Sequence, residues 1–309
     1  MTPHDTKKTV SLNEARNFIV AMSKPMGEAV ELIDRNSKEI EKTENQCKAD
    51  DNEIQKFQER LHFKGFERQR NHLNHPITVC THEDCKEYKL IGKSKQLETI
   101  YTQICHKPCS LKGVPVETTN NEQLHHCRAM ANGTCRHCKH DYRDHMHMTY
   151  TTSLVQKTFL SDDIQKEINN KTNVKDKKQK LIEVLEKRIE EYKKEKEVLY
   201  RCASHFGAFL KQNAMIPYND SFREYLDMLM KDEQTKEEVD TKRIAQLRED
   251  KQTYEMMKKA IIDETSSPAH SEGKDIGIEM IYEMRREVCS LKHNGKDLKE
   301  ALGTVNFSK

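Results

Sequence analysis

Seven of the ten cysteines of this chain lie between residues 80 and 138, where they are interleaved with histidines. Thiolates and imidazoles are ligands that zinc prefers in proteins, and two of them on a short loop can bind the same ion. The segment is therefore predicted to be a zinc-binding module. The candidate ligands run Cys80-x4-Cys85, Cys105-His106-x2-Cys109, Cys127-x7-Cys135-x2-Cys138, then His140, His145 and His147.

The number of donors limits the number of ions. The seven cysteines and His145 make eight ligands, enough for two closed, four-coordinate zinc sites, with His140, His147 and His106 as further candidates. Spacing alone leaves the pairing open between sequential and interleaved sites. In the strand predicted here, we expect the imidazoles of His145 and His147 to point to opposite faces, so that only one of them binds a given ion. The remaining histidines, His82 among them, are predicted to be solvent-exposed.

Other uses of these cysteines have to be weighed. The N-terminal residues MTPHDTKKTV lack the apolar core of a signal peptide, so a cytoplasmic protein is expected, and reducing conditions there favour metal over disulfides. A catalytic zinc needs an open position, whereas this thiolate-rich set suits a closed one. A cysteine–histidine nucleophile fits the spacing, but the clustering of thiols argues against a single activated one. We therefore expect two structural zinc ions and no enzyme activity.

The composition predicts a mainly α-helical protein. Charged residues make up 34% of the chain and hydrophobic residues 35%, a balance typical of long helices that bury a single stripe. The 53 Lys and Arg nearly match the 51 Asp and Glu, which argues against a strong attraction to nucleic acid or to anionic membranes. No run of 18 apolar residues suggests a membrane span. The predicted fold class is long amphipathic or coiled-coil helices flanking a small Cys/His-rich zinc-binding α+β or irregular β module.

The first helix is predicted to begin at Ser11, which is followed three residues later by Glu14 in a capping-box spacing. Pro25 should kink this helix or end it. Whether the stripe packs in a coiled coil or against its own chain stays open. The two heptad seams are Leu12, Ile19, Met26, Ile33, Ile40, Cys47, Ile54 and Leu61, and Ala15, Met22, Ala29, Asn36, Thr43, Asp50 and Phe57.

Further helices are predicted from Ser161 to Leu210, from Phe222 to Ile262, and from Ile278 to a stop at Asn294-Gly295. Short strands are expected in PITVCTH, GVPVET and MHMTYTTSLV, which are rich in β-branched residues. The resulting division is a disordered N-terminus (1–10), an amphipathic or coiled-coil region (11–74), the zinc-binding module (75–155), a coiled-coil and helical-hairpin region (156–265), a linker (266–273), and a C-terminal helix and tail (274–309).

Several stretches resemble a known family. SLNEARNFIVAMSKPM, VCTHEDCKEY, ICHKPCSLKGVP and LHHCRAMANGTCRHCKHDYRDHMHMTY together resemble the region downstream of the G domain in AIG-type P-loop GTPase-like proteins, over about residues 8–155 and here without the G domain. In that family a helix, a Cys/His-rich segment of unknown function and coiled coil follow the GTPase domain. The family usually has a second cysteine two positions after the one matching Cys138. This chain has His140, which the resemblance therefore marks as a ligand.

The resemblance and the seams together suggest a non-catalytic, zinc-stabilised coiled-coil scaffold for protein–protein interaction. Its expected partners are copies of itself or AIG-type GTPase-like proteins, contacted through the helices. GTP binding is not implied, because the chain has no Walker motif. Two alternatives are a RING or tripartite-motif-like ubiquitin ligase module, and a zinc-knot nucleic-acid binder that would use the modest basic patch FKGFERQRNHLNH (63–75).

Overall fold

The computed structural model describes residues 6–49, 61–62, 64–92, 96–111, 114, 118–213, 220–265 and 276–302, with the side chains of residues 6–11 and 265 left out. The helices in this part of the chain are α1 (Thr6–Ala49), α3 (Asp162–Asn169), α4 (Val174–Gln212), α5 (Ser221–Gln234), α6 (Thr241–Thr265), α7 (Ile278–Cys289) and α8 (Gly295–Leu302). The strands are β1 (Lys64–Cys80), β2 (Lys86–Leu90), β3 (Leu97–Tyr101), β4 (Ile104–His106), β5 (Met130–Ala131), β6 (Thr134–Cys135) and β7 (His145–Thr158). The predicted mainly helical fold with a small sheet region is confirmed.

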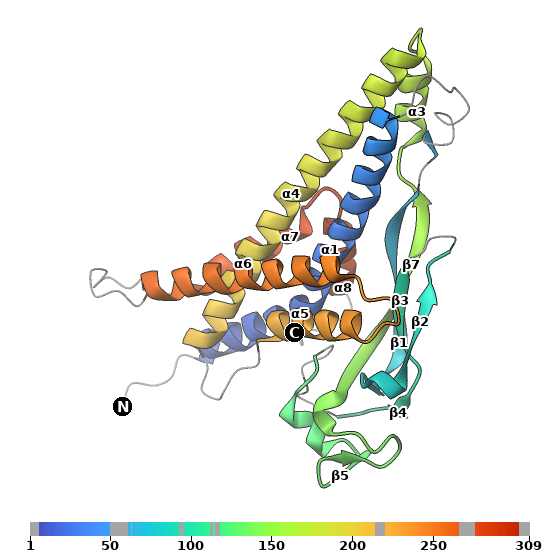
Figure 1. Ribbon diagram of the computed structural model, residues 1–309. Helices are drawn as coiled ribbons and strands as arrows, with labels where there is room; N and C mark the ends of the chain where they lie inside the picture. Colours follow the sequence, from blue (N-terminus) through green and yellow to red (C-terminus); the bar gives the residue numbers. More distant parts are fainter. Residues whose placement is uncertain are drawn as a thin grey trace.

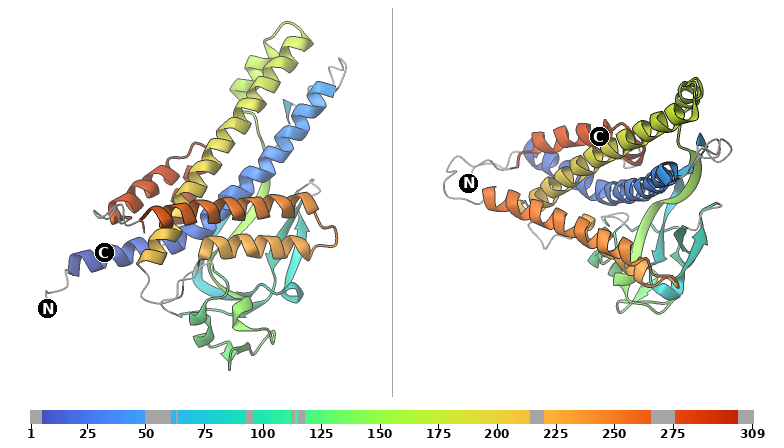
Figure 2. Two further views of the ribbon diagram at one scale, coloured as in Figure 1. Left: turned by 60° about the vertical axis from the view of Figure 1, so that its left-hand side comes forward. Right: turned by 45° about the horizontal axis from the view of Figure 1, so that its top comes forward.

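The two longest helices, α1 and α4, lie side by side, and the long strands β1 and β7 run along the flank of α1 (Figure 1). Helices α5 and α6 lie next to each other and cross this pair, while α7 packs against α4 (Figure 2). The Cys/His-rich segment lies at the end of the sheet where β1 stops and β7 starts, near β4 and β5 (Figure 1). Among the described residues, no helix is long and apolar enough to cross a bilayer.

Helix α1 begins at Thr6, five residues before the predicted start at Ser11. It continues through Pro25, so of the two predicted effects of this proline, the end of the helix is wrong. The Ser23 hydroxyl donates to the carbonyl of Ile19 (2.9 Å) inside the same stretch. Burial against the rest of the chain explains how the helix tolerates the proline, since tertiary packing supplies most helical stability in proteins.

The apolar seam of α1 is buried within its own chain. Ile19, Met26, Ile33 and Ile40 are 0–2% exposed, and they share one hydrophobic core with buried residues of α4 such as Leu199. Of the two arrangements left open by the heptads, the structure shows this helix packed in cis. Ile54, Asp50 and Phe57 lie outside the described residues.

Polar seam residues serve as links between elements. The Asn36 amide donates to the Phe66 carbonyl (3.0 Å) and accepts from the Phe66 N–H (2.7 Å), so it satisfies the backbone of β1. Lys196 of α4 pairs with Asp34 of α1 (2.6 Å) and Asp250 of α6 (3.0 Å). Asn36 therefore joins α1 to the sheet, and Lys196 joins α4 to α1 and α6.

The later helices are divided differently from the prediction. The stretch from Phe222 to Ile262 forms two helices, α5 and α6, instead of one. Asp220 is the N-cap of α5, and its carboxylate accepts from the N–H of Arg223 (3.3 Å). Helix α7 ends at Cys289, and Gly295, predicted to end a helix, begins α8. The linker 266–273 lies outside the described residues.

The main sheet has the order β4-β1-β7, with antiparallel pairs throughout. Strand β1 starts at Lys64, inside the region predicted to be helical up to residue 74, because its residues pair with the distant β7 from Lys64↔Thr158 to Cys80↔His145. A register shift between His72 and Ile77 accommodates Pro76, which has no N–H to donate. The GVPVET strand is not found at Val114 or Thr118, and residues 115–117 lie outside the described part.

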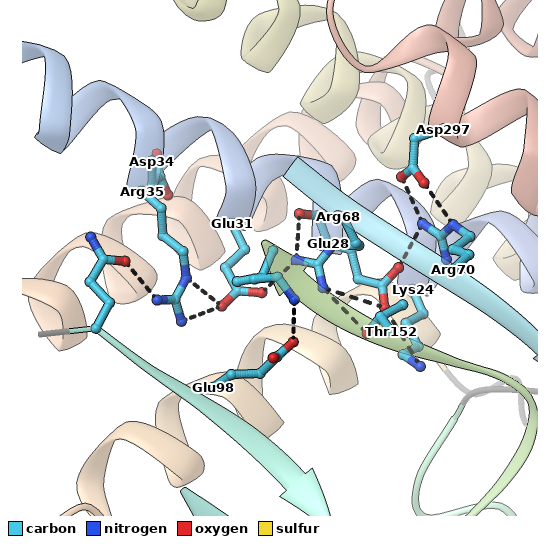
Figure 3. Close-up of polar contacts among 12 residues, drawn as sticks. Lys24, Glu28, Glu31, Asp34, Arg35, Arg68, Arg70, Glu98, Thr152 and Asp297 are labelled. Atoms are coloured by element: carbon cyan, nitrogen blue, oxygen red, sulfur yellow. Dashed lines mark hydrogen bonds and ion pairs between the residues drawn. The ribbon is translucent and has the colours of Figure 1, made fainter. Parts of the chain in front are cut away.

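A layer of paired charges joins α1 to the sheet. Figure 3 shows Glu28 and Glu31 of α1 facing Arg68 and Arg70 of β1, with Asp297 of α8 beyond them. Burial by itself raises the pKa of the two glutamates, but the surrounding cations outweigh it and lower the pKa of both. This network orients β1, and with it the Cys/His-rich end of the sheet, relative to the helices.

Candidate metal centres

Three groups of cysteine and histidine side chains meet at the Cys80–His145 end of the sheet. Within each group the candidate ligand atoms all lie within 4.8 Å of one another. The groups are Cys80, Cys85, Cys138 and His140; Cys105, Cys135, Cys138 and His145; and His106, Cys109 and Cys127. They include ten of the eleven residues predicted as ligands or further candidates, and the eleventh, His147, is buried beside them.

In the first group, Cys80 ends β1 and Cys85 closes the 3-10 turn Glu83–Cys85. The Nδ1 atom of His140 lies 3.4 Å from the Cys80 sulfur and 3.5 Å from the Cys85 sulfur. With Zn–S near 2.3 Å and Zn–N near 2.0–2.1 Å, a tetrahedral ion separates a sulfur and a nitrogen ligand by about 3.5 Å. On the other side of the ring, an Asp84 oxygen lies 3.7 Å from Nε2 and can help to orient it.

In the second group, the sulfur atoms of Cys105 and Cys138 lie 3.7 Å apart, against about 3.8 Å for two thiolates on one tetrahedral zinc. The His145 Nε2 atom lies 3.4 Å from the Cys138 sulfur. The His145 Nδ1 atom lies 2.8 Å from the Asp141 carbonyl oxygen, which accepts the Nδ1 proton. That hydrogen bond selects the tautomer that leaves Nε2 free for a metal.

Cys138 belongs to both four-ligand groups, so they contain seven residues in total. Burial opposes its ionisation, but the backbone N–H of His140 and the neighbouring thiols donate hydrogen bonds that lower the pKa of Cys138. By contrast, burial raises the pKa of Cys80 and Cys105. Of these three thiols, Cys138, the sulfur shared by the two groups, is the one whose pKa is lowered.

The backbone between residues 130 and 140 brings these ligands together. Strands β5 and β6 pair across a turn in which Asn132 and Gly133 have positive φ values of 52° and 82°. Lys139, with φ 68°, donates its N–H to the Cys135 carbonyl (3.0 Å), which turns the chain directly after Cys138. The Cys-x2-Cys pair is thus held on a tight hairpin.

The pairing of the first two groups is interleaved, one of the two arrangements that spacing left open. The first group takes ligands from residues 80 and 85 and from residues 138 and 140, and Cys105 of the second group lies between these two pairs in the sequence. The prediction that His145 and His147 point to opposite faces is wrong, since residues two apart in a strand share a face. They nevertheless lie near different groups. Burial is the main cause that lowers the pKa of both, which favours neutral imidazoles.

The sequence prediction missed the surroundings of His82. This ring stacks on the ring of His140, with 3.7 Å between their centroids. His82, Asp84 and His140 also form a fourth, more exposed group of possible metal ligands. The signal in the sequence was its position between Cys80 and Cys85. The other three cysteines, Cys47, Cys202 and Cys289, lie in helices and are buried or half-buried.

A cavity of about 190 Å³ lies between α1, the sheet and α5. Its lining combines apolar side chains such as Met148 with the charged residues Glu31, Arg35 and Arg68. These charges pair with one another at 2.8–3.1 Å, so the cavity borders the charged layer that supports the sheet.

The fold and these groups define a mainly helical protein that carries a Cys/His-rich module able to hold metal ions. Residues 72–151 match the model of a family described as a domain of unknown function (DUF8206). That match covers about a quarter of the chain and contains all eleven candidate ligands. No curated protein and no solved structure matches the chain.

Proposed function

We propose that this protein is a non-catalytic scaffold that is stabilised by structural zinc and acts through protein–protein contacts. The observation that supports this proposal best is the presence of two buried or half-buried groups with four sulfur or imidazole ligands each. Four such ligands complete a tetrahedral zinc and leave no position for a substrate or a reactive water. In this proposal, two zinc ions share the Cys138 thiolate.

The need for metal follows from the composition of the module. One of the module's small hydrophobic clusters consists of Ile77, Val79, Met146 and Met148. In another, six of the eight buried residues are the candidate ligands Cys80, Cys85, Cys105, Cys109, Cys127 and Cys135. If these thiols were left to pack as apolar residues, little other hydrophobic surface would hold the segment together. A structural zinc contributes about 10 kcal/mol or more to folding, which compensates for that small core.

The proposed partners are a second copy of the chain or an AIG-type GTPase-like protein, met in the cytoplasm. Because the α1 seam is buried in cis, a contact would use other surfaces. Strands β2, β3 and β4 expose Leu90, Ile100 and Ile104 at 57%, 38% and 46% of their surface, and we propose contact there. Scattered exposed apolar residues are common, so the proposal depends on the binding test.

Two experiments test the proposal. Native mass spectrometry before and after chelation, with circular dichroism alongside, should show zinc lost together with β signal while most helical signal stays. A metal-free chain with an unchanged spectrum would contradict the zinc component. Sedimentation at micromolar concentration, alone and with a GTPase-like relative, tests the contact. A strictly monomeric chain without affinity for that relative would refute the scaffold role.

The structure provides arguments against both alternatives. In the patch 63–75, the side chains of Arg68 and Arg70 are 5% and 2% exposed and pair with Glu31, Glu28 and Asp297, so they are not available to phosphates. Cys80 and Cys85 share their group with Cys138 and His140, and Cys138 also belongs to the second group, whereas the cross-brace of a RING joins alternate pairs. An autoubiquitination assay and a salt-dependent binding assay with duplex and single-stranded nucleic acid check these points.

A further inference from the structure

We propose that the module holds a third metal ion, bound by His106, Cys109 and Cys127 and completed by His147. The inference rests on the proposed zinc dependence of the module. It adds a separate site, because these four residues belong to neither of the two groups that share Cys138.

Three of the four ligands are already gathered. The His106 Nδ1 atom lies 3.2 Å from the Cys127 sulfur, and the sulfur atoms of Cys109 and Cys127 lie 3.9 Å apart. Two thiolates on one tetrahedral zinc are separated by about 3.8 Å. The spacing of this group therefore matches a metal site as closely as that of the other two.

The strand register brings His147 to the same place. Thr78 of β1 is paired with His106 of β4 on one side and with His147 of β7 on the other. Directly paired residues project from the same face of a sheet, so both imidazoles flank the Thr78 side chain. The Thr78 hydroxyl lies 3.6 Å from the Cys127 sulfur. His106 thus lies next to Cys127, and His147 lies on the other side of the same threonine.

The state of His147 itself points to a ligand. Its side chain is 3% exposed, and among the described residues its buried Nδ1 atom has no hydrogen-bond partner. An unsatisfied buried polar atom is destabilising, and a bound ion is one of the recognised explanations for such an atom. The ligand atoms of His106, Cys109 and Cys127 lie within 4.8 Å of one another, and His147 is outside this group. Coordination by His147 therefore requires a change in its side-chain torsions.

The resulting site would have two thiolates and two imidazoles, a closed set that suits Zn²⁺ and its tetrahedral substitutes Co²⁺ and Cd²⁺. Its role follows from the chain segments that it joins. Cys109 and Cys127 bracket the segment that connects β4 to the 3-10 turn Glu122–His126, while His106 and His147 belong to the two outer strands of the sheet. The ion would attach that connection to the sheet.

The test counts ions and identifies their ligands. The chain is reconstituted with zinc for native mass spectrometry and with ¹¹³Cd for NMR. We expect three ions and three cadmium resonances in the wild type. Cys109→Ser should lose one ion and keep two. His147→Ala should weaken binding of the third ion at least 10-fold, and the exposed His126→Ala serves as the matched control.

A further variant covers the case in which His147→Ala does not fold. His147→Cys keeps a ligand at this position but makes the site richer in sulfur, so one cadmium resonance should move downfield while three ions remain bound. Two ions in the wild type, unchanged by Cys109→Ser, would overturn the third site and leave the proposed function intact. Three ions with no response to either His147 variant would refute the role of that residue. A chain that binds no metal would refute the proposed function itself.

Discussion

The ammonium nitrogen of Lys86 lies 2.6 Å from a carboxylate oxygen of Asp232, in an ion pair that joins β2 to α5. The two side chains are 0% and 8% exposed. The Tyr88 hydroxyl donates to the Asp232 carbonyl (3.1 Å) in the same contact. Lys86 directly follows the candidate ligand Cys85, so this pair connects the Cys/His-rich end of the sheet to the helices.

Breaking this pair should destabilise the protein. Lys86→Met leaves the Asp232 carboxylate buried without its cation, and we expect a loss of about 3–5 kcal/mol in the free energy of unfolding. Urea denaturation measures the loss. The double variant Lys86→Met, Asp232→Leu removes both charges and should recover most of it. Equal losses in the single and double variants would show that the pair matters only as packing.

Replacing Gly27 by alanine should lower stability, although alanine is the better helix former. A Cβ atom on this residue of α1 would overlap the ring of Tyr225 in α5. We expect the clash to outweigh the gain of about 1 kcal/mol in helix propensity and to cost about 1–3 kcal/mol overall. Thermal unfolding checks the sign. In a Tyr225→Leu background the same substitution should be nearly neutral, and a stabilising effect in the wild type would contradict the packing.

Cys138→Ser should disturb two metal sites at once. Its sulfur belongs to both four-ligand groups, whereas Cys85 belongs to one. In native mass spectra at limiting zinc, we expect Cys138→Ser to lose or weaken two ions and Cys85→Ser only one. The buried Cys202 of α4 lies in the helical core and provides the control, since Cys202→Ser should leave the metal count unchanged. The same loss from Cys138→Ser and Cys85→Ser would argue against a shared thiolate.

Glu191 should contribute stability that depends on pH. Although burial opposes it, hydrogen bonds from Lys292 and His293 lower the pKa of Glu191 from 4.5 to about 2. A carboxylate with a lowered folded-state pKa stabilises the protein above its unfolded pKa, and this contribution is lost as pH falls through the folded value. Glu191→Gln should therefore be less stable at pH 7, by on the order of 1 kcal/mol for a partly exposed pair.

The measurement is the difference in melting temperature between wild type and Glu191→Gln across a pH series. This difference should shrink between about pH 4.5 and pH 2. Acid also protonates zinc ligands, but it does so in both proteins, so the comparison removes that effect. Glu190→Gln is the matched control, because Glu190 and its partner Lys194 are 59% and 71% exposed. A pH-independent difference would show that Glu191 acts through its shape alone.

Much of the helical architecture could be predicted from the sequence because its signals are local. The seven-residue spacing of Ile19, Met26 and Ile33 predicts one buried helix face, whether that face packs on the same chain or on another. The segment against which a helix packs cannot be predicted from such local signals. In the sequence, Asn36 is only a polar residue at an apolar heptad position, and the folded chain shows that it satisfies the backbone of Phe66 in β1. Strand β1 was missed up to residue 74 for the same reason, since its partner β7 lies far along the chain.

The candidate metal ligands show the same division. Residue type and short spacing were enough to identify the cysteines and histidines, because the preference of zinc for thiolate and imidazole is a property of the side chains themselves. Their grouping is not local. Cys80 meets Cys138, and His147 lies across Thr78 from His106, only because the antiparallel register of β1 with β4 and β7 brings them together. Sequence chemistry therefore determined which residues can bind metal, and tertiary structure decided which of them can share an ion, since coordination depends on distances of a few ångströms that spacing along the chain does not set.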